Sequence, residues 1–291
     1  MPIEASELIL NPDGSVYHLN LRPEHIANTI IVVGDQDRVS RVTDHFNTVE
    51  FTIQKREFRT STGTYKGKRI TVVSTGIGTD NIDIVFNELD ALVNIDLEKR
   101  EIKSKLTSLD IIRIGTSGSI QENIPIDSFV ASEYAVGFDS LLHFYDSEHV
   151  QDFKISEALK QQTNWFNKKS DPYVVKCSSR LLKAITSEKT ANGFTATNVG
   201  FYGPQGRILR LALQDNELND KLAAFNYEGK TITNLEMETS AIYGISSLLG
   251  HQALSMNAII ANRATGEFSA DPKQVVDDLI LYTLNKIINL E

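Results

Sequence analysis

Short runs of β-branched residues alternate along this chain with segments whose apolar residues recur at helical spacing. The run at 29–33 leads through Gly34 and Asp35 into a helical segment, and the run at 70–75 precedes an apolar stripe over 82–93. Alternation of this kind places strands in a central sheet and helices on its faces. The chain is therefore predicted to have an α/β fold. No linker, low-complexity tract or repeat interrupts the sequence, which predicts a single domain over 1–291.

The same patterns predict the remaining elements. A hairpin is expected from 57–65, the turn 66–69 and 70–75, and a buried strand from 109–114 that ends at Gly115. Helices are expected after Gly78 and after Ser178, at 239–249, and from Asp271, which can cap the last helix. Further strands are expected at 128–134, 172–176, 231–235 and 253–260.

Composition excludes several classes of function. The formal net charge is -9, so no general basic field attracts nucleic acid or an anionic membrane, and any anion must be bound locally. Cys177 is the single cysteine and the six histidines are scattered, which predicts no disulfide and no multi-cysteine or histidine metal site. Neither a secretory signal nor a transmembrane run is visible, so a cytoplasmic location is expected.

Gln205 and Arg207 lie two residues apart in a Gly/Pro-rich loop that also contains Phe201. A glutamine offers one acceptor and two amide donors, and an arginine adds five donors and a fixed charge. Together they can bind a small planar imide beside an aromatic face. The alternative is an ordinary solvated turn, so this loop needs partners elsewhere in the chain.

Three arginines stand where strands or tight loops are expected to end: Arg38, Arg56 and Arg113. In an acidic chain they can converge on a phosphate, helped by loop amides and the Thr116 hydroxyl. Surface salt bridges are the alternative. That alternative is strong for Arg56, which precedes Glu57, and weak for Arg113, because a guanidinium flanked by isoleucines needs a buried partner.

Glu236, Met237 and Glu238 lie between an expected strand and an expected helix. Glutamate carboxylates accept hydrogen bonds from sugar hydroxyls, and methionine supplies an adaptable apolar wall. Capping of the following helix is an equally good interpretation of Glu238. The dinucleotide-binding interpretation of Gly76-Ile77-Gly78 fails, because Asn81 occupies the place of the third glycine. Taken alone, His18 and Cys177 are best explained as structural residues.

Eight blocks in order along most of the chain resemble the nucleoside phosphorylase-I family, and within it the members that act on uridine. They are Val16 to Leu19, Val33 to Val39, Lys55 to Phe58, Ser74 to Gly78, Arg113 to Gly118, Phe201 to Arg207, Glu236 to Glu238, and Ile260 to Arg263. The resemblance implies a single-domain three-layer fold with a central, distorted mixed β-sheet surrounded by helices. It also implies a homo-oligomer built from dimers, usually a hexamer.

The resemblance assigns a role to each matching residue. Phosphate would be bound by Gly34, Arg38, Arg113, Gly115 and Thr116, with Arg56 donated by the neighbouring subunit. Ribose would be bound by Met237, Glu238 and Thr116, with His18 donated by the neighbour to the 5'-hydroxyl. The base would be held by Phe201, Gln205, Arg207, Ile260 and Ala261. Glu57 and Ser74 match positions that in some relatives help to hold a monovalent cation, such as K+, at a dimer interface.

The implied reaction is the reversible, phosphate-dependent cleavage of uridine to uracil and ribose 1-phosphate, a pentosyl transfer of pyrimidine nucleoside salvage. Inorganic phosphate is the co-substrate and no cofactor is implied; Arg113, Glu238, Arg207 and Gln205 are the expected catalytic groups. One alternative is a purine nucleoside phosphorylase, which would carry an aspartate where residues 260–263 have none. The other is a non-catalytic nucleoside-binding protein of the same fold.

The chain departs from the family pattern in several places. Gln36 replaces the usual proline after Gly-Asp, which predicts a looser turn that still carries Arg38. Ala261 replaces a larger branched residue, which predicts a roomier base pocket. The segments 96–108 and 209–229 are longer than the family core and are expected to reshape a lid or an oligomer contact.

Overall fold

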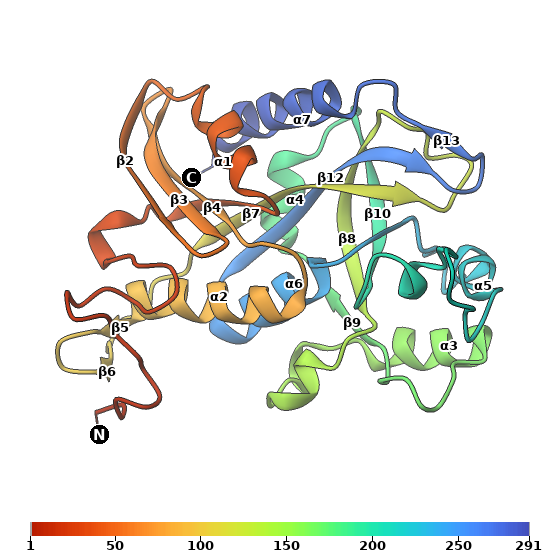
Figure 1. Ribbon diagram of the computed structural model, residues 1–291, viewed down its shortest axis with the longest axis horizontal. Coiled ribbons are helices and arrows are strands. Elements are labelled where there is room, and N and C mark those ends of the chain that lie inside the picture. Colours follow the sequence, from red (N-terminus) through yellow and green to blue (C-terminus); the bar gives the residue numbers. More distant parts are fainter. Residues whose placement is uncertain (1, 291) are drawn as a thin grey trace.

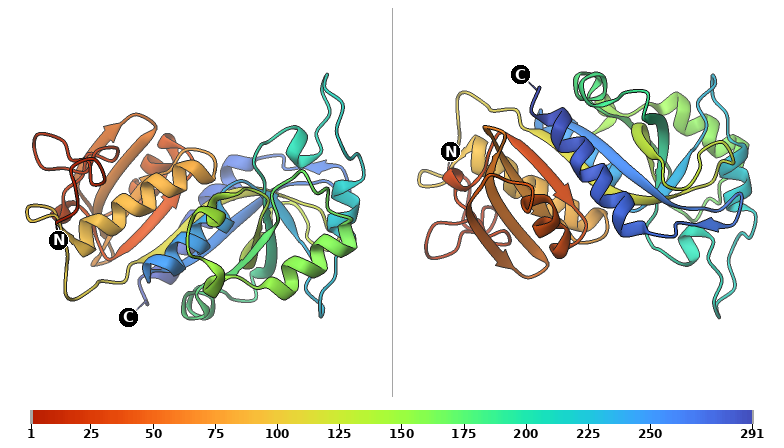
Figure 2. Two further views of the ribbon diagram at one scale, coloured as in Figure 1. Left: turned by 90° about the horizontal axis from the view of Figure 1, so that it is seen from below. Right: turned by 90° about the horizontal axis from the view of Figure 1, so that it is seen from above.

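A computed structural model describes residues 2–290 of the chain, so both ends of the predicted domain, residues 1 and 291, lie outside the described residues. The fold is α/β, as predicted, with one large mixed sheet between two groups of helices (Figure 1). Helices α1 and α7 lie on one side of the strands, and α2 and α6 lie on the other (Figure 1). The two further views look at these layers from below and from above, so that α2 lies in front of the strands in the left view and α7 in front of them in the right view (Figure 2). Within residues 2–290, no helix is both long and apolar enough to cross a membrane.

The bounds of the elements are as follows. The strands are β1 Thr29–Val33, β2 Thr48–Lys55, β3 Phe58–Tyr65, β4 Lys68–Ser74, β5 Ile95–Asp96, β6 Glu101–Ile102, β7 Asp110–Ser119, β8 Phe129–Gly137, β9 Tyr173–Lys176, β10 Thr190–Thr197, β11 Asn234–Glu236, β12 Gln252–Asn262 and β13 Glu267–Phe268. The α-helices are α1 Gln36–Thr43, α2 Thr79–Asn94, α3 Phe153–Thr163, α4 Ser179–Ile185, α5 Leu218–Ala224, α6 Thr239–Leu249 and α7 Pro272–Ile287. Short 3-10 turns, including Gly203–Gln205, join them.

The sheet is distorted because β7 pairs with three other strands. It pairs in parallel with β1 along its first half and with β12 along its whole length, and its last residues also pair antiparallel with β11. Strands β12, β8, β10 and β11 complete a closed ring of pairings with β7, whereas β1, β4, β3 and β2 continue from β7 as an open sheet. The predicted central, distorted mixed sheet is therefore confirmed.

Local chemistry sets the ends of the best-predicted helices. The Asp35 carboxylate accepts a hydrogen bond from the Asp37 amide at the start of α1, and Asp271 caps α7 through the Gln274 amide. Gly250 ends α6 with φ 78°, the left-handed conformation that glycine adopts without strain. The apolar stripe of α7 packs on β12 and β7, as its spacing predicted.

Several boundary predictions were wrong. Strand β7 does not end at Gly115 but continues to Ser119, because β12 and β11 supply pairing partners for its Gly/Thr/Ser-rich second half. The hairpin turn has two residues rather than four, since Lys68 already pairs with Tyr65 and both Lys66 and Gly67 have positive φ. The strand expected at 231–235 is Asn234–Glu236. No prediction covered β2, α3, β10 or α5.

The two longer segments have different structures. Residues 96–108 include the short β5–β6 hairpin, which pairs Ile95 with Ile102. Residues 209–229 begin with an irregular stretch, in which Leu209 and Leu211 are exposed, and then form α5. Helix α5 packs against α3 and brings Asn219 to the loop that contains Gln205.

Candidate active site

A cavity of about 300 Å³ opens where β1, β4 and β12 end. The carboxyl edge of parallel strands is the usual place for a ligand site in an α/β fold. We call this space the carboxyl-edge cavity; its lining residues are Gly34, Asp35, Arg38, Ile77, Arg113, Thr116, Ser117, Gly118, Phe201, Gln205, Arg207, Leu235, Glu236, Met237, Glu238, Ile260, Ala261 and Phe268.

Most of the site residues expected from the sequence line this one cavity. They are Gly34, Arg38, Arg113, Thr116, Phe201, Gln205, Arg207, Met237, Glu238, Ile260 and Ala261. Gly115, His18 and Arg56 are not among the lining residues. Gly115 has a different relation to the site: a Cβ atom at this position would lie 2.0 Å from Nη1 of Arg113. The absence of a side chain at Gly115 thus leaves room for the Arg113 guanidinium.

Arg113 has the buried partners that its sequence context required. Its Nη2 atom lies 2.6 Å from Oε2 of Glu238 and 3.3 Å from Oε2 of Glu236, and its Nη1 donates to Oδ1 of Asn257 at 2.8 Å. Burial alone would lower the pKa of Arg113, but the two carboxylates outweigh it and raise the pKa. The guanidinium is therefore a fixed positive charge within the cavity wall.

Glu236 rather than Glu238 carries out the capping. Its carboxylate accepts hydrogen bonds from the Thr239 amide at 3.0 Å and from the Thr239 and Thr197 hydroxyls. Glu238 makes no side-chain cap bond to α6. Its Oε1 instead accepts from the Gly78 amide at 3.0 Å, and its Oε2 accepts from Arg113. The capping interpretation therefore applies to Glu236, whereas Glu238 keeps the interpretation as a group that can accept hydrogen bonds from a sugar.

Arg38 lies beside Arg113 with much of its side chain buried. Its Nη1 donates to the main-chain oxygen of Ile114 at 3.3 Å, and Asp35 lies 3.9 Å from its Nη2. Its buried Nε has no hydrogen-bond partner among the described residues. Burial lowers the pKa of Arg38, with a smaller opposing effect from Asp35. A buried, under-satisfied guanidinium gains hydrogen bonds when an anion binds next to it.

Arg207, which also lines the carboxyl-edge cavity, is held over the ring of Phe201. Its guanidinium carbon lies 3.8 Å from the ring centroid, and its Nη1 donates to Oε1 of Gln205 at 2.6 Å. Gln205 is buried, and its amide NH₂ donates no hydrogen bond to residues 2–290. Arg207 therefore fixes the glutamine carbonyl and leaves two amide donors for a ligand.

Arg263 and Asn219 support this loop and were missed as site residues. Arg263 donates from Nη1 to the main-chain oxygen of Gln205, and Asn219 donates to the same oxygen at 3.0 Å. Burial and the nearby Arg263 lower the pKa of Arg207, and neither arginine has a carboxylate within 4 Å among residues 2–290. This part of the cavity lining is thus electropositive. Arg263 closes a block that the sequence had singled out, whereas nothing in the sequence pointed to Asn219.

His18 and Arg56 gather elsewhere on the chain, around Tyr17. The His18 ring lies edge-on to the Tyr17 ring at 4.9 Å, and the Arg56 guanidinium lies 5.7 Å from the same ring. Nδ1 of His18 is 2.7 Å from Oε1 of Glu88. Arg56 is exposed, with φ 55°. The expectation that the neighbouring subunit donates both residues stays a prediction.

Glu57 and Ser74, the residues expected near a cation, are in contact through a hydrogen bond to the main chain of Glu57. The Ser74 hydroxyl donates to the Glu57 carbonyl oxygen at 3.0 Å. Within residues 2–290, no three His, Cys, Asp or Glu side chains form a group suited to a metal ion. Cys177 is buried, and burial raises the pKa of its thiol to about 12, in keeping with a structural role.

The family model described as "Phosphorylase superfamily" matches residues 28–282. The chain belongs to this superfamily. A solved relative, a nucleoside phosphorylase of Trypanosoma brucei described as showing uridine phosphorylase activity, superposes with a TM-score of 0.87. It is 29% identical, over 97% of this chain and 100% of that one.

Sequence relatives include phosphorylases of both base classes. A uridine phosphorylase of Thermococcus kodakarensis is 27% identical over 88% of this chain and 80% of its own length. A DeoD-type purine nucleoside phosphorylase of Colwellia psychrerythraea is 26% identical over 93% of this chain and 98% of its own. These comparisons support a nucleoside phosphorylase, a pentosyltransferase of the superfamily.

Proposed function

We propose that the chain catalyses the reversible, phosphate-dependent cleavage of uridine to uracil and ribose 1-phosphate, as part of cytoplasmic pyrimidine salvage. One observation carries the proposal. The carboxyl-edge cavity is lined together by two arginines, Arg38 and Arg113, by the Glu238 carboxylate that Arg113 holds, and by the Gln205 and Arg207 pair. These groups match the phosphate, ribose and pyrimidine parts of the two substrates.

The proposed base site favours a departing pyrimidine anion. As the glycosidic bond lengthens, the base gains negative charge, so donors directed at it stabilise the transition state more than the ground state. Gln205 offers its amide donors to the polar edge of uracil, while Arg207 and Arg263 supply positive charge without a nearby carboxylate among the described residues. Ile260 and Ala261 form the apolar wall.

The proposed phosphate site holds the nucleophile. Arg38 has an unpartnered buried Nε, and Thr116 lines the same cavity. A phosphate bound there lies below the anomeric carbon, stabilises the cationic sugar and then attacks it. Positioning supplies much of the rate enhancement, and no covalent enzyme intermediate is required.

Glu238 binds the ribose hydroxyls between these two sites. The Gly78 amide and Arg113 orient its carboxylate, and Met237 lines the cavity beside it. Because one carboxylate carries up to four acceptor sites, Glu238 can keep both contacts and still accept from a sugar hydroxyl. Glu238 also connects the sugar to the arginine that faces the phosphate.

The proposed enzyme is a homo-oligomer built from dimers, usually a hexamer in this family. The partner subunit's His18 would reach the 5'-hydroxyl, and the partner subunit's Arg56 would reach the phosphate. Two observations support this arrangement. His18 and Arg56 both lie against the Tyr17 ring, and neither lines the carboxyl-edge cavity of its own chain. A K+ ion near Glu57 and Ser74 at the same interface belongs to this proposal.

The test is a product assay with uridine, deoxyuridine, thymidine and inosine, each with and without phosphate. Phosphate-dependent release of uracil from uridine is the expected result. Preference for inosine would identify a purine nucleoside phosphorylase, and equal turnover without phosphate would exclude phosphorolysis. Binding of uridine without turnover in either condition would identify a nucleoside-binding protein.

A further inference from the structure

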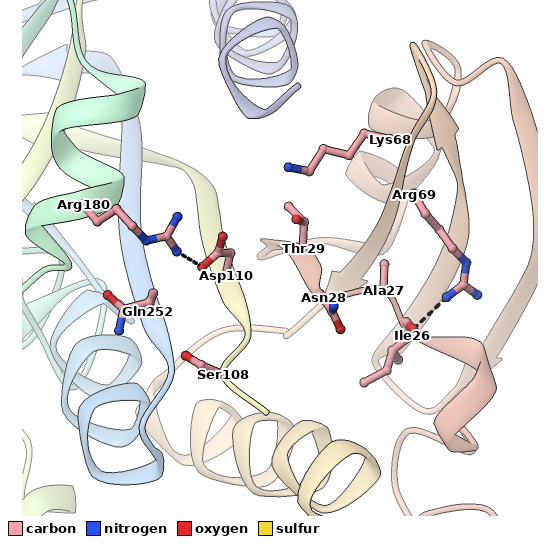
Figure 3. A pocket seen from close by; sticks show the side chains of 10 residues that line it. All are labelled: Ile26, Ala27, Asn28, Thr29, Lys68, Arg69, Ser108, Asp110, Arg180 and Gln252. Carbon is pink, nitrogen blue, oxygen red and sulfur yellow. Dashed lines mark hydrogen bonds and ion pairs between the residues drawn. The ribbon is translucent and has the colours of Figure 1, made fainter. Parts of the chain in front are cut away.

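A second, larger cavity of about 820 Å³ lies at the opposite edge of the sheet (Figure 3). Four of its lining residues are the first residues of four parallel strands: Lys68 of β4, Thr29 of β1, Asp110 of β7 and Gln252 of β12. We call it the amino-edge cavity; its other lining residues are Ile26, Ala27, Asn28, Arg69, Ser108 and Arg180. None of these residues lines the carboxyl-edge cavity.

The lining of the amino-edge cavity carries more positive than negative side chains, although the protein as a whole is acidic. Lys68, Arg69 and Arg180 face a single acidic lining residue, Asp110, although the whole chain has a net charge of -9. Arg69 is committed elsewhere, because it pairs with Glu50 at 2.8 Å and donates to the Ile26 carbonyl. Lys68 has no carboxylate partner among residues 2–290, and Arg180 pairs with Asp110 through one guanidinium nitrogen only, so these two cations keep donors for a ligand.

Lys68 and Arg180 extend into the same space from opposite walls (Figure 3). Nζ of Lys68 donates to the main-chain oxygen of Leu290 at 2.6 Å, and no carboxylate lies within 4 Å of it among residues 2–290. Arg180 forms an ion pair with Asp110. Burial lowers the pKa of Lys68; the negative charge of Asp110 opposes this effect, and the positive charge of Arg180 adds a smaller one in the same direction as burial. An anion bound between Lys68 and Arg180 would relieve the repulsion between the two cations.

Neutral hydrogen-bonding groups complete the lining. The Asn28 side chain makes no hydrogen bond to the described residues, and Gln252 uses only its carbonyl, which accepts from Ser178 at 2.6 Å. The volume lies within the range of small-molecule sites. Lysine and arginine are the usual ligands of phosphate groups, and free amides suit a sugar or a base.

We propose that the amino-edge cavity is a second ligand site, which binds a small phosphate ester of nucleotide size. Lys68 and Arg180 contact the phosphate, and Asn28 and the Gln252 amide contact the organic part. The site is separate from phosphorolysis, because its residues begin the strands whose far ends carry the carboxyl-edge cavity.

Calorimetric titration of the full-length protein tests the proposal with AMP, ribose 5-phosphate, adenosine and inorganic phosphate. The two esters are expected to bind, and adenosine is not. Lys68→Met and Arg180→Met should each weaken AMP binding by about tenfold or more, since each removes a charged hydrogen-bond donor. Lys66→Met, which removes a lysine from the adjacent turn outside the lining, should leave the affinity unchanged.

Two further measurements separate this site from the carboxyl-edge cavity. Arg38→Met should leave AMP binding unchanged, and Lys68→Met should keep its uridine turnover and thermal unfolding within about twofold and a few degrees of wild type. AMP binding that is lost in Arg38→Met, or kept in both Lys68→Met and Arg180→Met, would overturn the proposal, as would no binding of either ester. Inorganic phosphate that binds through Lys68 as tightly as the esters would overturn the ester assignment.

Discussion

Oε2 of Glu238 lies 2.6 Å from Nη2 of Arg113, and both side chains are buried. The contact joins a residue proposed to bind ribose to one proposed to bind phosphate. A buried pair of this kind stabilises a fold little compared with well-packed apolar residues, and removal of either partner leaves an uncompensated charge. The pair is therefore better explained as an active-site arrangement than as a contribution to stability.

The first prediction concerns pH. Burial raises the pKa of Glu238, with an opposing effect from Arg113 and a reinforcing one from Glu236. An ionised carboxylate accepts hydrogen bonds from ribose better than its acid form does, so kcat/KM for uridine should fall as the pH falls through a pKa above the ordinary glutamate value. Glu238→Gln should be slower at neutral pH and should lack this acid limb. An acid limb that survives unchanged in Glu238→Gln would assign the ionisation to another group.

The second prediction concerns charge on the leaving base. Arg207→Ala should lower kcat/KM for uridine by an amount equivalent to about 2–4 kcal/mol of transition-state stabilisation. Arg210→Ala is the matched control, because Arg210 is exposed and does not line the carboxyl-edge cavity. Uridine turnover that is equal in the two variants would remove Arg207 from the mechanism.

The third prediction concerns the room that Gly115 leaves for Arg113. Because a Cβ atom at position 115 would lie 2.0 Å from the guanidinium, Gly115→Ala must displace the Arg113 side chain or β7 itself. We expect a loss of about 1–3 kcal/mol in the free energy of unfolding, together with a higher KM for phosphate. Denaturant unfolding and phosphate kinetics measure the two effects, and an unchanged KM for phosphate would mean that Arg113 does not contact this substrate.

The sequence predicted the parts of the fold that are set locally. Asp35, Gly250 and Asp271 define helix ends through their own chemistry, and the apolar stripes of α2 and α7 follow from spacing. The second half of β7 was unpredictable, because Gly115 to Ser119 has weak strand propensity and is strand only through its pairing with β12 and β11.

The candidate site shows the same division. Ordered motifs along the chain named eleven residues that line the carboxyl-edge cavity. Asn219 has no local signal, since it reaches Gln205 only because α5 folds back against the loop. The assignment of capping to Glu236 rather than Glu238 likewise depends on the position at which α6 begins.

The fourth prediction concerns Asn219 as a positioning residue. Its hydrogen bond to the Gln205 carbonyl holds the loop that presents the amide donors. Asn219→Ala should raise KM for uridine and lower kcat while leaving KM for phosphate unchanged, because only the base site is loosened. Asp220→Ala, at an exposed position of the same helix, is the control. Equal changes in both KM values would indicate a general loss of structure instead.

The last prediction concerns donation across the subunit interface. If Arg56 acts in the partner's site, Arg56→Met and Arg38→Met should each be nearly inactive alone. Consider a mixed dimer of one Arg56→Met chain and one Arg38→Met chain. The site of the Arg56→Met chain has an intact Arg38 and receives an intact Arg56 from the other chain, so it has neither defect, whereas the second site has both. Co-expression with two different affinity tags isolates this dimer, and its turnover should recover to about half of wild type. If Arg56 instead acts in its own chain, each site of the mixed dimer keeps one defect and no activity returns.

Arg59→Met paired with Arg38→Met is the control, because Arg59 belongs to β3 and lies outside the Tyr17 cluster. Unlike the Arg56→Met homodimer, the Arg59→Met homodimer should be active on its own, before it is mixed with Arg38→Met chains.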